Sequence, residues 1–257
     1  MDFVPIRARD DAVLRITARQ VHTITEPPLR AQITDQLVRY FPARCRYLGA
    51  MRLDDAVRAY MQGARHHGMH TEREIAACVH LMFLLGHDMH RDPQLPWVAR
   101  LLGEDRSPWR RIVAVRAHAM AYLDRIHGRD NAALDRSLAR LSRLTAAELE
   151  HQVGADNELG TMFALLRRLH PEKVEALGEP LLESLWAENH AQSRSLGLDV
   201  RESQMWLVLQ FTLGSGIAVD PQYPWIAVAL ARRRHGNLLH DFAGDYFEHM
   251  RGPGAQE

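Results

Sequence analysis

The sequence predicts an all-α protein, a helical bundle built from two tandem copies of one helical unit related by pseudo-symmetry. Along most of the chain, apolar residues recur at spacings of three and four, which is the period of an amphipathic helix. No stretch of comparable length shows the strict alternation of apolar and polar residues that marks a half-buried strand. In addition, a series of short motifs returns 128 or 129 residues later in the chain, which indicates an internal repeat.

The N-terminal part of the chain predicts an extended piece followed by two helices. Residues 13–16 are expected to be extended. The proline pair at 27–28 disfavours helix on its N-terminal side and suits the first turn of the helix expected over residues 29–41. A second amphipathic helix is expected over residues 54–67, with Gly68 as its C-cap.

The following helix is expected to be buried, because apolar residues cover nearly its whole circumference as far as Gly86. Thr71 is its expected N-cap, and Glu74 is placed to reach back as the capping-box partner. A loop then enters a short helix that ends near Leu102. In this loop Asp92 precedes a proline, which predicts an N-cap followed by the first helical residue.

Helical periodicity continues through the rest of the chain. Thr145 and Glu148 predict a second capping box. Aromatic residues at helical spacing near the C-terminus are expected to dock on the core, and residues 252–257 are expected to fray. The predicted helices cover residues 108–127, 131–144, 145–153, 158–169 and 236–251.

The internal repeat is the strongest signal in the sequence. The two copies share a proline after the first helix, glycines at the helix ends and the motif Asp-Pro-Gln-x-Pro-Trp. The matched positions are Pro42 and Pro171, Gly68 and Gly197, Glu74 and Glu202, Gly86 and Gly214, Asp92 and Asp220, and Trp97 and Trp225. We expect copies at residues 34–102 and 163–230, connecting helices over 103–162, and a single domain over 1–257.

The repeated Asp-Pro-Gln-x-Pro-Trp motif allows two interpretations. As a recognition loop it would present tryptophan, which is enriched in interface hot spots, to another protein. The candidate partner-binding residues are then Trp97, Tyr223, Trp225, His87 and Asp88. As a structural element, Asp92 and Asp220 cap helices and each tryptophan packs on the preceding buried helix. We favour the structural interpretation, because a motif present in both copies marks what the unit needs in order to fold.

The charge composition argues against several function classes. Lys and Arg number 32 and Asp and Glu number 32, so no net field gathers nucleic acid or anionic lipid. The densest basic run, residues 232–235, lacks flanking aromatic residues and is interpreted as a solvated helix end. Lys173 is the single lysine and lies far from any glycine-rich loop, which excludes P-loop chemistry and argues against a Schiff-base enzyme.

The histidines raise a metal hypothesis that the sequence does not favour. His87, His90 and Asp92 have zinc-ligand types, but the second copy lacks both histidines, so the loop does not need them to fold. Glu148 and His151 match half of a di-iron signature whose second half is absent. The glycines around Ser215 superficially resemble a nucleophile turn without assignable partners. We expect no enzyme activity, no metal and no cofactor.

The same sequence predicts a cytoplasmic protein. The two cysteines lie far apart and Cys78 falls in an apolar run, as free thiols in a reducing compartment do. The start of the chain lacks the apolar stretch of a signal peptide. No run of eighteen apolar residues occurs, so no membrane partner is expected.

Residues 81–97 contain the pattern Leu-Gly-x-Asp-x-x-x-Asp-Pro-Gln-x-Pro-Trp, preceded by Phe41-Pro42 and Gly68. With these residues the chain resembles a family of helical bacterial proteins that are commonly encoded near type VI secretion clusters, beside effectors and their adaptor chaperones. The resemblance covers residues 13–102 well, and the second copy more weakly. Its motif carries no catalytic residue, so the resemblance implies a context and not a reaction.

Two roles fit that context. The first is an accessory chaperone or adaptor that holds a secretion effector, or the effector's own adaptor, for loading onto the secretion spike. The second is a cytoplasmic immunity protein that blocks its cognate effector. Immunity proteins often carry a strong charge opposite to that of their target, whereas this chain is balanced. We therefore favour the chaperone. A metal- or ligand-binding helical enzyme stays open through the histidines alone.

Overall fold

The computed structural model describes residues 18–150, 158–232 and 238–251, and within these ranges its regular elements are all helical. This confirms the all-α prediction. The elements are α1 (Ala18–Tyr40), α2 (Pro42–His66), α3 (Glu72–Leu85), α4 (Pro96–Leu102), α5 (Pro108–His127), the 3₁₀ turn η1 (Arg129–Asn131), α6 (Ala132–Leu141), α7 (Ala146–Glu150), α8 (Glu158–Leu169), α9 (Pro171–Leu196), α10 (Val200–Leu213), α11 (Pro224–Arg232) and α12 (Leu238–Arg251).

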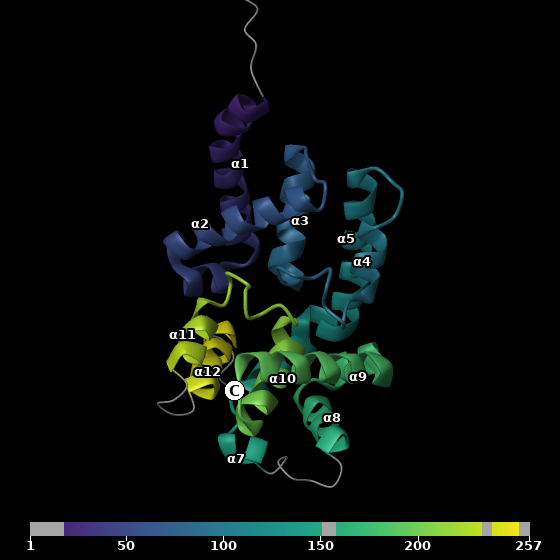
Figure 1. The fold of residues 1–257 in the computed structure, drawn as a ribbon, viewed down its shortest axis with the longest axis vertical. Coiled ribbons are helices and arrows are strands. Elements are labelled where there is room, and N and C mark those ends of the chain that lie inside the picture. Colours follow the sequence, from purple (N-terminus) through teal and green to yellow (C-terminus); the bar gives the residue numbers. More distant parts are fainter. Residues whose placement is uncertain (1–17, 151–157, 233–237, 252–257) are drawn as a thin grey trace, which may run out of the picture.

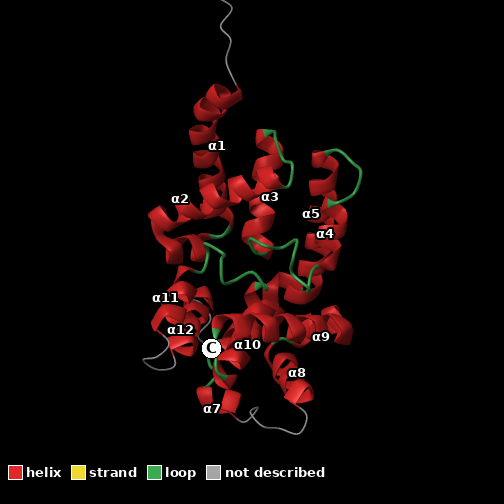
Figure 2. Ribbon diagram, in the orientation of Figure 1, coloured by secondary structure: helices red, strands yellow, loops and turns green. Residues whose placement is uncertain are grey.

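The helices form two groups that meet at a pair of loops. In Figure 1, α1 to α5 lie in the upper half and α7 to α12 in the lower half. The loops between α3 and α4 and between α10 and α11 run across the middle, where Figure 2 shows them in green. Across the boundary, α5 packs on α9 and α12 packs on α2. The two groups therefore contact each other through helices as well as through the loops.

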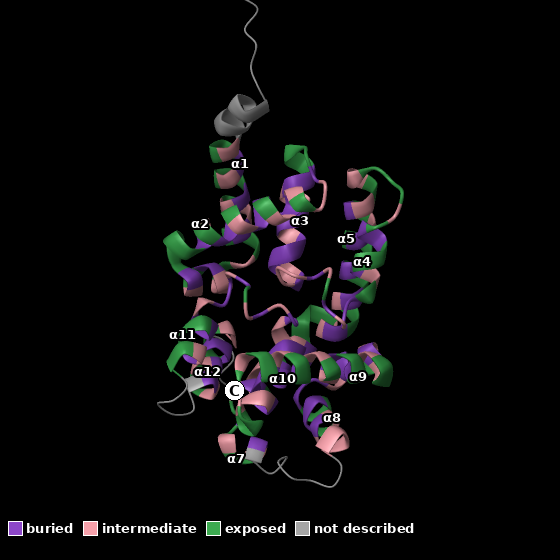
Figure 3. Cartoon of the chain, viewed as in Figure 1, coloured by how far each residue is buried: buried purple, intermediate pink, exposed green. Residues whose placement is uncertain are grey.

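The buried faces follow the predicted apolar stripes. In α1, Leu29, Ile33 and Leu37 are buried, while the sides of the outer helices turned away from the core are exposed (Figure 3). The buried helices α3 and α10 pack on α2 and α9, respectively. Their burial stabilises the fold, since removing apolar surface from water is the main favourable term in folding.

The capping boxes on the two buried helices are formed. In α3 the Thr71 side chain accepts from the Glu74 amide, and the Glu74 carboxylate accepts from the Thr71 amide at 3.0 Å. This confirms the prediction for Thr71. In α10, Asp199 and Glu202 form the equivalent pair. Thr145 and Glu148 exchange the same two bonds at the start of α7, as predicted.

The start of the first helix was predicted wrongly. The proline pair was expected to block helix before residue 29, but α1 continues through Pro27 and Pro28 from Ala18. A proline inside a helix removes one backbone hydrogen bond and strains the preceding turn, which is costly but does not prohibit the helix. The Arg65–Glu26 ion pair of 3.3 Å ties this part of α1 to α2.

The second helix also begins earlier than expected, at Pro42 instead of residue 54. Pro42 does not only end the preceding helix; it occupies the first turn of the next one, where its missing N–H is no loss. Gly49, with φ 73° and ψ 162°, then breaks α2 into two helical pieces. In α9, Pro171 and Gly178 do the same, and Gly178 has φ 71° and ψ 168°.

Other boundaries agree more closely. The predicted helices over 108–127 and 158–169 coincide with α5 and α8, and the C-terminal helix corresponds to α12. The predicted helix over 131–144 is shortened to α6. The extended piece at 13–16, most of the basic run at 233–235, His151 and the tail at 252–257 lie outside the described residues. Of the described helices, none combines the length and apolar character that crossing a bilayer requires.

Candidate functional site

The two central loops, residues 86–95 and 214–223, lie against each other through their backbones. Each begins at a glycine with a backbone that other residues rarely adopt: Gly86 has φ 104° and Gly214 has φ 105°. A Cβ placed on Gly214 would lie 3.3 Å from the Leu85 carbonyl oxygen and 3.2 Å from the Asp92 carboxylate. Both positions therefore need glycine for conformation, and Gly214 also needs it for space.

The aspartates of the repeated motif exchange hydrogen bonds between these loops. The Asp92 carboxylate accepts from the Ser215 amide at 2.9 Å and from the Gln94 amide at 2.8 Å. The Asp220 carboxylate accepts from the His87 amide at 2.8 Å and from the Gln222 amide at 2.9 Å. Each carboxylate thus accepts from the backbone amide of the second residue of the opposite loop.

This corrects the role predicted for Asp92 and Asp220. Both were expected to cap the helix that follows them, but α4 begins at Pro96 with Leu95 as its N-cap, and α11 begins at Pro224. The carboxylates instead close a local turn and fasten the opposite loop. Burial raises the pKa of both aspartates, and their backbone hydrogen bonds oppose that shift.

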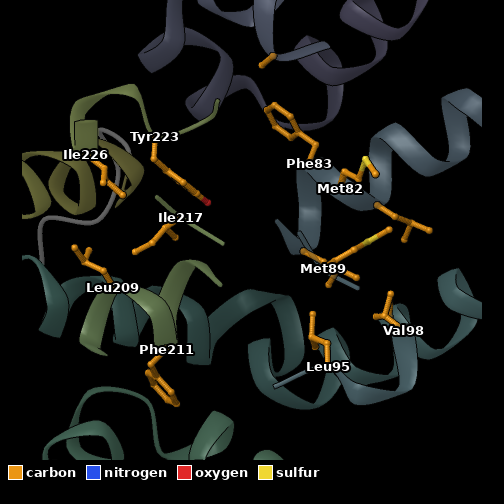
Figure 4. Packing of buried hydrophobic residues seen from close by; sticks show 14 of the residues in the cluster. Met82, Phe83, Met89, Leu95, Val98, Leu209, Phe211, Ile217, Tyr223 and Ile226 are labelled. Atoms are coloured by element: carbon orange, nitrogen blue, oxygen red, sulfur yellow. The ribbon is translucent and has the colours of Figure 1, made fainter. Parts of the chain in front are cut away.

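The Asp220 carboxylate has an additional buried partner, since it also accepts from the Tyr60 hydroxyl of α2. The His87 ring stacks on the Tyr60 ring with centroids 5.4 Å apart. Met89 and Ile217, one from each of the two central loops, are buried in the core and are labelled in Figure 4.

The residues considered for partner binding do not form one exposed surface. Tyr223 and Trp225 are 4% and 5% exposed, and both rings pack on Tyr246 of α12. A protein docking on the surface cannot use these two rings, because they belong to the core. Trp97 is partly buried and stacks on His118 of α5 at 5.8 Å. Each tryptophan therefore contacts a ring of the helix that follows its own, α5 for Trp97 and α12 for Trp225.

His87 and Asp88 are half-buried beside the crossing loops. Their side chains lie 3.7 Å apart, and the Asp88 side chain fills the space next to Gly216. The His67 and His90 rings make an edge contact at 4.5 Å, and burial lowers the pKa of His67 to about 4. Within the described ranges, no three His, Cys, Asp or Glu side chains gather in a way that would hold a metal ion.

The sequence analysis did not identify two cationic side chains that lie next to the two central loops. Arg44 of α2 donates to the Phe83 carbonyl oxygen at 2.8 Å, and Lys173 of α9 donates to the Phe211 carbonyl oxygen. Each cation bonds a carbonyl near the C-terminus of a buried helix, where the helix dipole favours positive charge. Their equivalent places after Pro42 and Pro171 were the signal that could have found them.

Both cations line a partly open cavity of about 90 Å³ together with Asp92, Tyr122 and His127. Burial lowers the pKa of Lys173 to about 8, while Asp92 opposes this shift. Burial, together with the charges of Lys173 and Arg44, lowers the pKa of His127 to about 4. At neutral pH the cavity wall therefore carries two cations, the carboxylate of Asp92 and a neutral imidazole.

A second candidate site is an open cleft of about 420 Å³ between α6 and α8. Its side chains include four arginines, Arg136, Arg140, Arg143 and Arg168. Arg136 pairs with Glu172 at 2.9 Å and Arg168 pairs with Glu148 at 2.5 Å. Among the residues that the structure describes, Arg140 and Arg143 have no carboxylate within ion-pair distance, so the cleft carries positive charge in excess.

The chain matches no protein-family model, no curated protein and no solved structure at a significant level.

Proposed function

We propose that this protein is an accessory chaperone or adaptor that binds another protein through the arginine-lined cleft between α6 and α8. The observation that carries the proposal is the gathering of four guanidinium groups in one open cleft, two of them unpaired within the described chain. Guanidinium groups bind carboxylates in a bidentate manner, so the cleft fits an acidic segment of the partner.

The lining of the cleft favours an acidic protein segment over nucleic acid. Ala139, Leu144 and Leu169 supply its apolar contacts, and no aromatic side chain of the described residues lines it. Proteins that hold single-stranded nucleic acid usually stack bases on aromatic rings. An acidic segment with interspersed apolar residues would use both the arginines and the apolar contacts of this cleft.

The partner we propose is a type VI secretion effector, or the effector's own adaptor, which this protein holds for loading onto the secretion spike. The support is the resemblance carried by residues 81–97 and by Phe41, Pro42 and Gly68. A protein that presents a charged cleft on a rigid helical frame is suited to holding a partner without chemistry.

We also infer that residues 34–102 and 163–230 are two copies of one unit, related by an approximate two-fold axis that passes through the two central loops. Support comes from matched features: glycine breaks in α2 and α9, capping boxes on α3 and α10, and the exchange of hydrogen bonds between Asp92 and Asp220 and the opposite loops. Such an arrangement leaves the outer faces, including the α6–α8 cleft, free for a partner.

The test uses charge reversal in the cleft. Arg140→Glu with Arg143→Glu is expected to weaken the complex with the neighbouring effector or adaptor about tenfold or more, since it removes two carboxylate-binding groups and introduces repulsion. Arg100→Glu with Arg116→Glu is the matched control, because both arginines are exposed and lie outside the cleft. Circular dichroism checks that each variant is folded.

The cellular arm separates the chaperone from other roles. Deleting the gene is expected to abolish effector secretion while the cells stay viable. Cell death that depends on the effector would contradict the proposal and indicate immunity. Equal loss of binding in both double variants, or tight binding of single-stranded RNA that only the cleft variant loses, would also contradict it.

A further inference from the structure

Two cations line the partly open cavity between α2, α5, α6, α9 and the ends of α3 and α10. Arg44 and Lys173 each donate a hydrogen bond to a backbone carbonyl, and within the described chain neither has a carboxylate within ion-pair distance. Lys173 is 8% exposed and carries three N–H donors, of which the Phe211 carbonyl accepts one. Lys173 is buried and Arg44 is partly buried. Buried cations are ordinarily paired or fully hydrogen-bonded, whereas two N–H donors of Lys173 have no acceptor within the described chain.

Other polar groups on the cavity wall strengthen this imbalance. The Tyr122 hydroxyl is buried and has no hydrogen-bond partner. The Asp92 carboxylate already accepts from the Gln94 and Ser215 amides. The Gln94 Oε1 atom is an acceptor without a partner, but it is neutral, and the one charge of Asp92 offsets only one of the two cations.

We propose that this cavity binds a small monocarboxylate, with its oxygens held by Lys173 and Arg44 and assisted by the Tyr122 hydroxyl. The volume of about 90 Å³ is roughly that of three water molecules in the liquid, enough for a two- or three-carbon acid and too small for a drug-sized ligand. The proposal is independent of the arginine-lined cleft, because the cleft and the cavity share no lining residue.

The apolar part of the wall favours a carboxylate over an inorganic oxyanion. Leu85, Leu123 and Ile126 are among the apolar residues that line the cavity. They can contact the short alkyl part of an organic acid. A sulfate or phosphate ion would carry up to two charges and would turn some of its oxygens toward these apolar groups, where they could not be hydrogen-bonded.

The experiment measures acetate and glycolate binding to the full-length protein by isothermal titration at pH 7. A constant ionic strength is held with sodium chloride, and sodium sulfate and inorganic phosphate serve as comparison anions. We expect saturable binding of about one carboxylate per chain, and a line shift of carboxyl-labelled acetate in the ¹³C spectrum that the other acid reverses by competition. Sulfate and phosphate are expected to bind at least about tenfold more weakly.

Three variants assign the site. Lys173→Met removes the charge with little change of shape and is expected to weaken acetate binding about tenfold or more. Tyr122→Phe removes the hydroxyl alone, keeps the fold, and is expected to weaken binding about three- to tenfold. Tyr40→Phe is the control, because Tyr40 is 64% exposed and lies outside the cavity.

Failure to detect saturable acetate binding in the wild type would overturn the proposal. So would equal binding of sulfate or phosphate, which would indicate a general anion effect. Unchanged acetate affinity in Tyr122→Phe and in Lys173→Met would place any binding elsewhere and reject this cavity as the site.

Discussion

At the scale of single residues, the buried carboxylates of Asp92 and Asp220 explain why the motif occurs twice. Each is 4% exposed, and a buried carboxylate without partners would be strongly destabilising. Backbone amides from its own loop and from the opposite loop supply those partners. The sequence correctly marked both residues as structural, but it assigned their hydrogen bonds to the wrong backbone groups.

The two tryptophans of the motif are expected to contribute unequally to stability. Trp225→Ala should lower the free energy of unfolding by about 3–5 kcal/mol, because it opens a cavity against Tyr246 in the core. Trp97→Ala should cost about 1–2 kcal/mol, since the ring is partly solvated and stacks on exposed His118. Urea unfolding of the two variants measures the difference. Equal losses would contradict it.

Histidine burial predicts a loss of stability in acid. Burial, with a smaller contribution from the charge of Lys173, lowers the pKa of His170 from its ordinary value of 6.5 to about 4. Between these two pH values the unfolded chain binds more protons than the folded chain. The stability from the neutral imidazole is therefore fully present above pH 6.5 and is lost as the pH falls toward 4.

His170→Asn tests this contribution. The His170 side chain accepts from the Lys173 amide as the N-cap of α9, a role that asparagine also performs without titrating. We expect the fall in unfolding free energy between pH 7 and pH 4.5 to be about 2 kcal/mol smaller in the variant than in the wild type. Urea titrations at both pH values measure it, and the same fall in both proteins would contradict the assignment.

At the scale of elements, glycine decides where the two long helices bend. Gly49 and Gly178 have φ near +70° and ψ near 165°, a region that only glycine occupies without strain. The prolines that begin α2 and α9 and the glycines that break them are visible in the sequence. Hydrophobic periodicity did not reveal that helix resumes on both sides of the break, because each N-terminal piece is too short to show it.

Substitution of these glycines separates backbone strain from packing. Nothing lies within 4 Å of a Cβ added at Gly49, so Gly49→Ala should cost about 1–3 kcal/mol through strain alone, and Gly178→Ala a similar amount. Gly244 in α12 is the control, because it also has open space but no positive φ. Gly244→Ala should stabilise by up to about 1 kcal/mol. Thermal unfolding measures all three, and stabilisation by Gly49→Ala would contradict the argument.

At the scale of the whole molecule, the aspartate hydrogen bonds between the two loops, together with the packing of α5 on α9 and of α12 on α2, predict one cooperative unit. We expect the slowest-exchanging backbone amide protons of α3 and of α10 to report the same free energy of opening. Asp220→Asn should lower the protection of both helices, because the amide nitrogen of asparagine cannot accept from a backbone N–H. Native-state hydrogen exchange read by mass spectrometry measures both helices at once.

The control for this experiment is Asp199→Ala, which removes the exposed N-cap of α10. It should cost about 1 kcal/mol and leave the ratio of protection between α3 and α10 nearly unchanged. Lower protection of α10 alone in Asp220→Asn would contradict a single unit and would indicate two independently opening halves.

The sequence by itself determined that the chain is helical, the caps at Thr71 and Thr145, and the glycines where the chain must turn, because period, capping and glycine conformation are local properties. Only the tertiary structure decided which backbone amides Asp92 and Asp220 bind, that Tyr223 and Trp225 are buried, and that Arg44 and Lys173 share a cavity. The hydrogen bonds between the two loops and the shared cavity join residues more than a hundred positions apart. No local pattern encodes such contacts, since they depend on how the two groups of helices pack together.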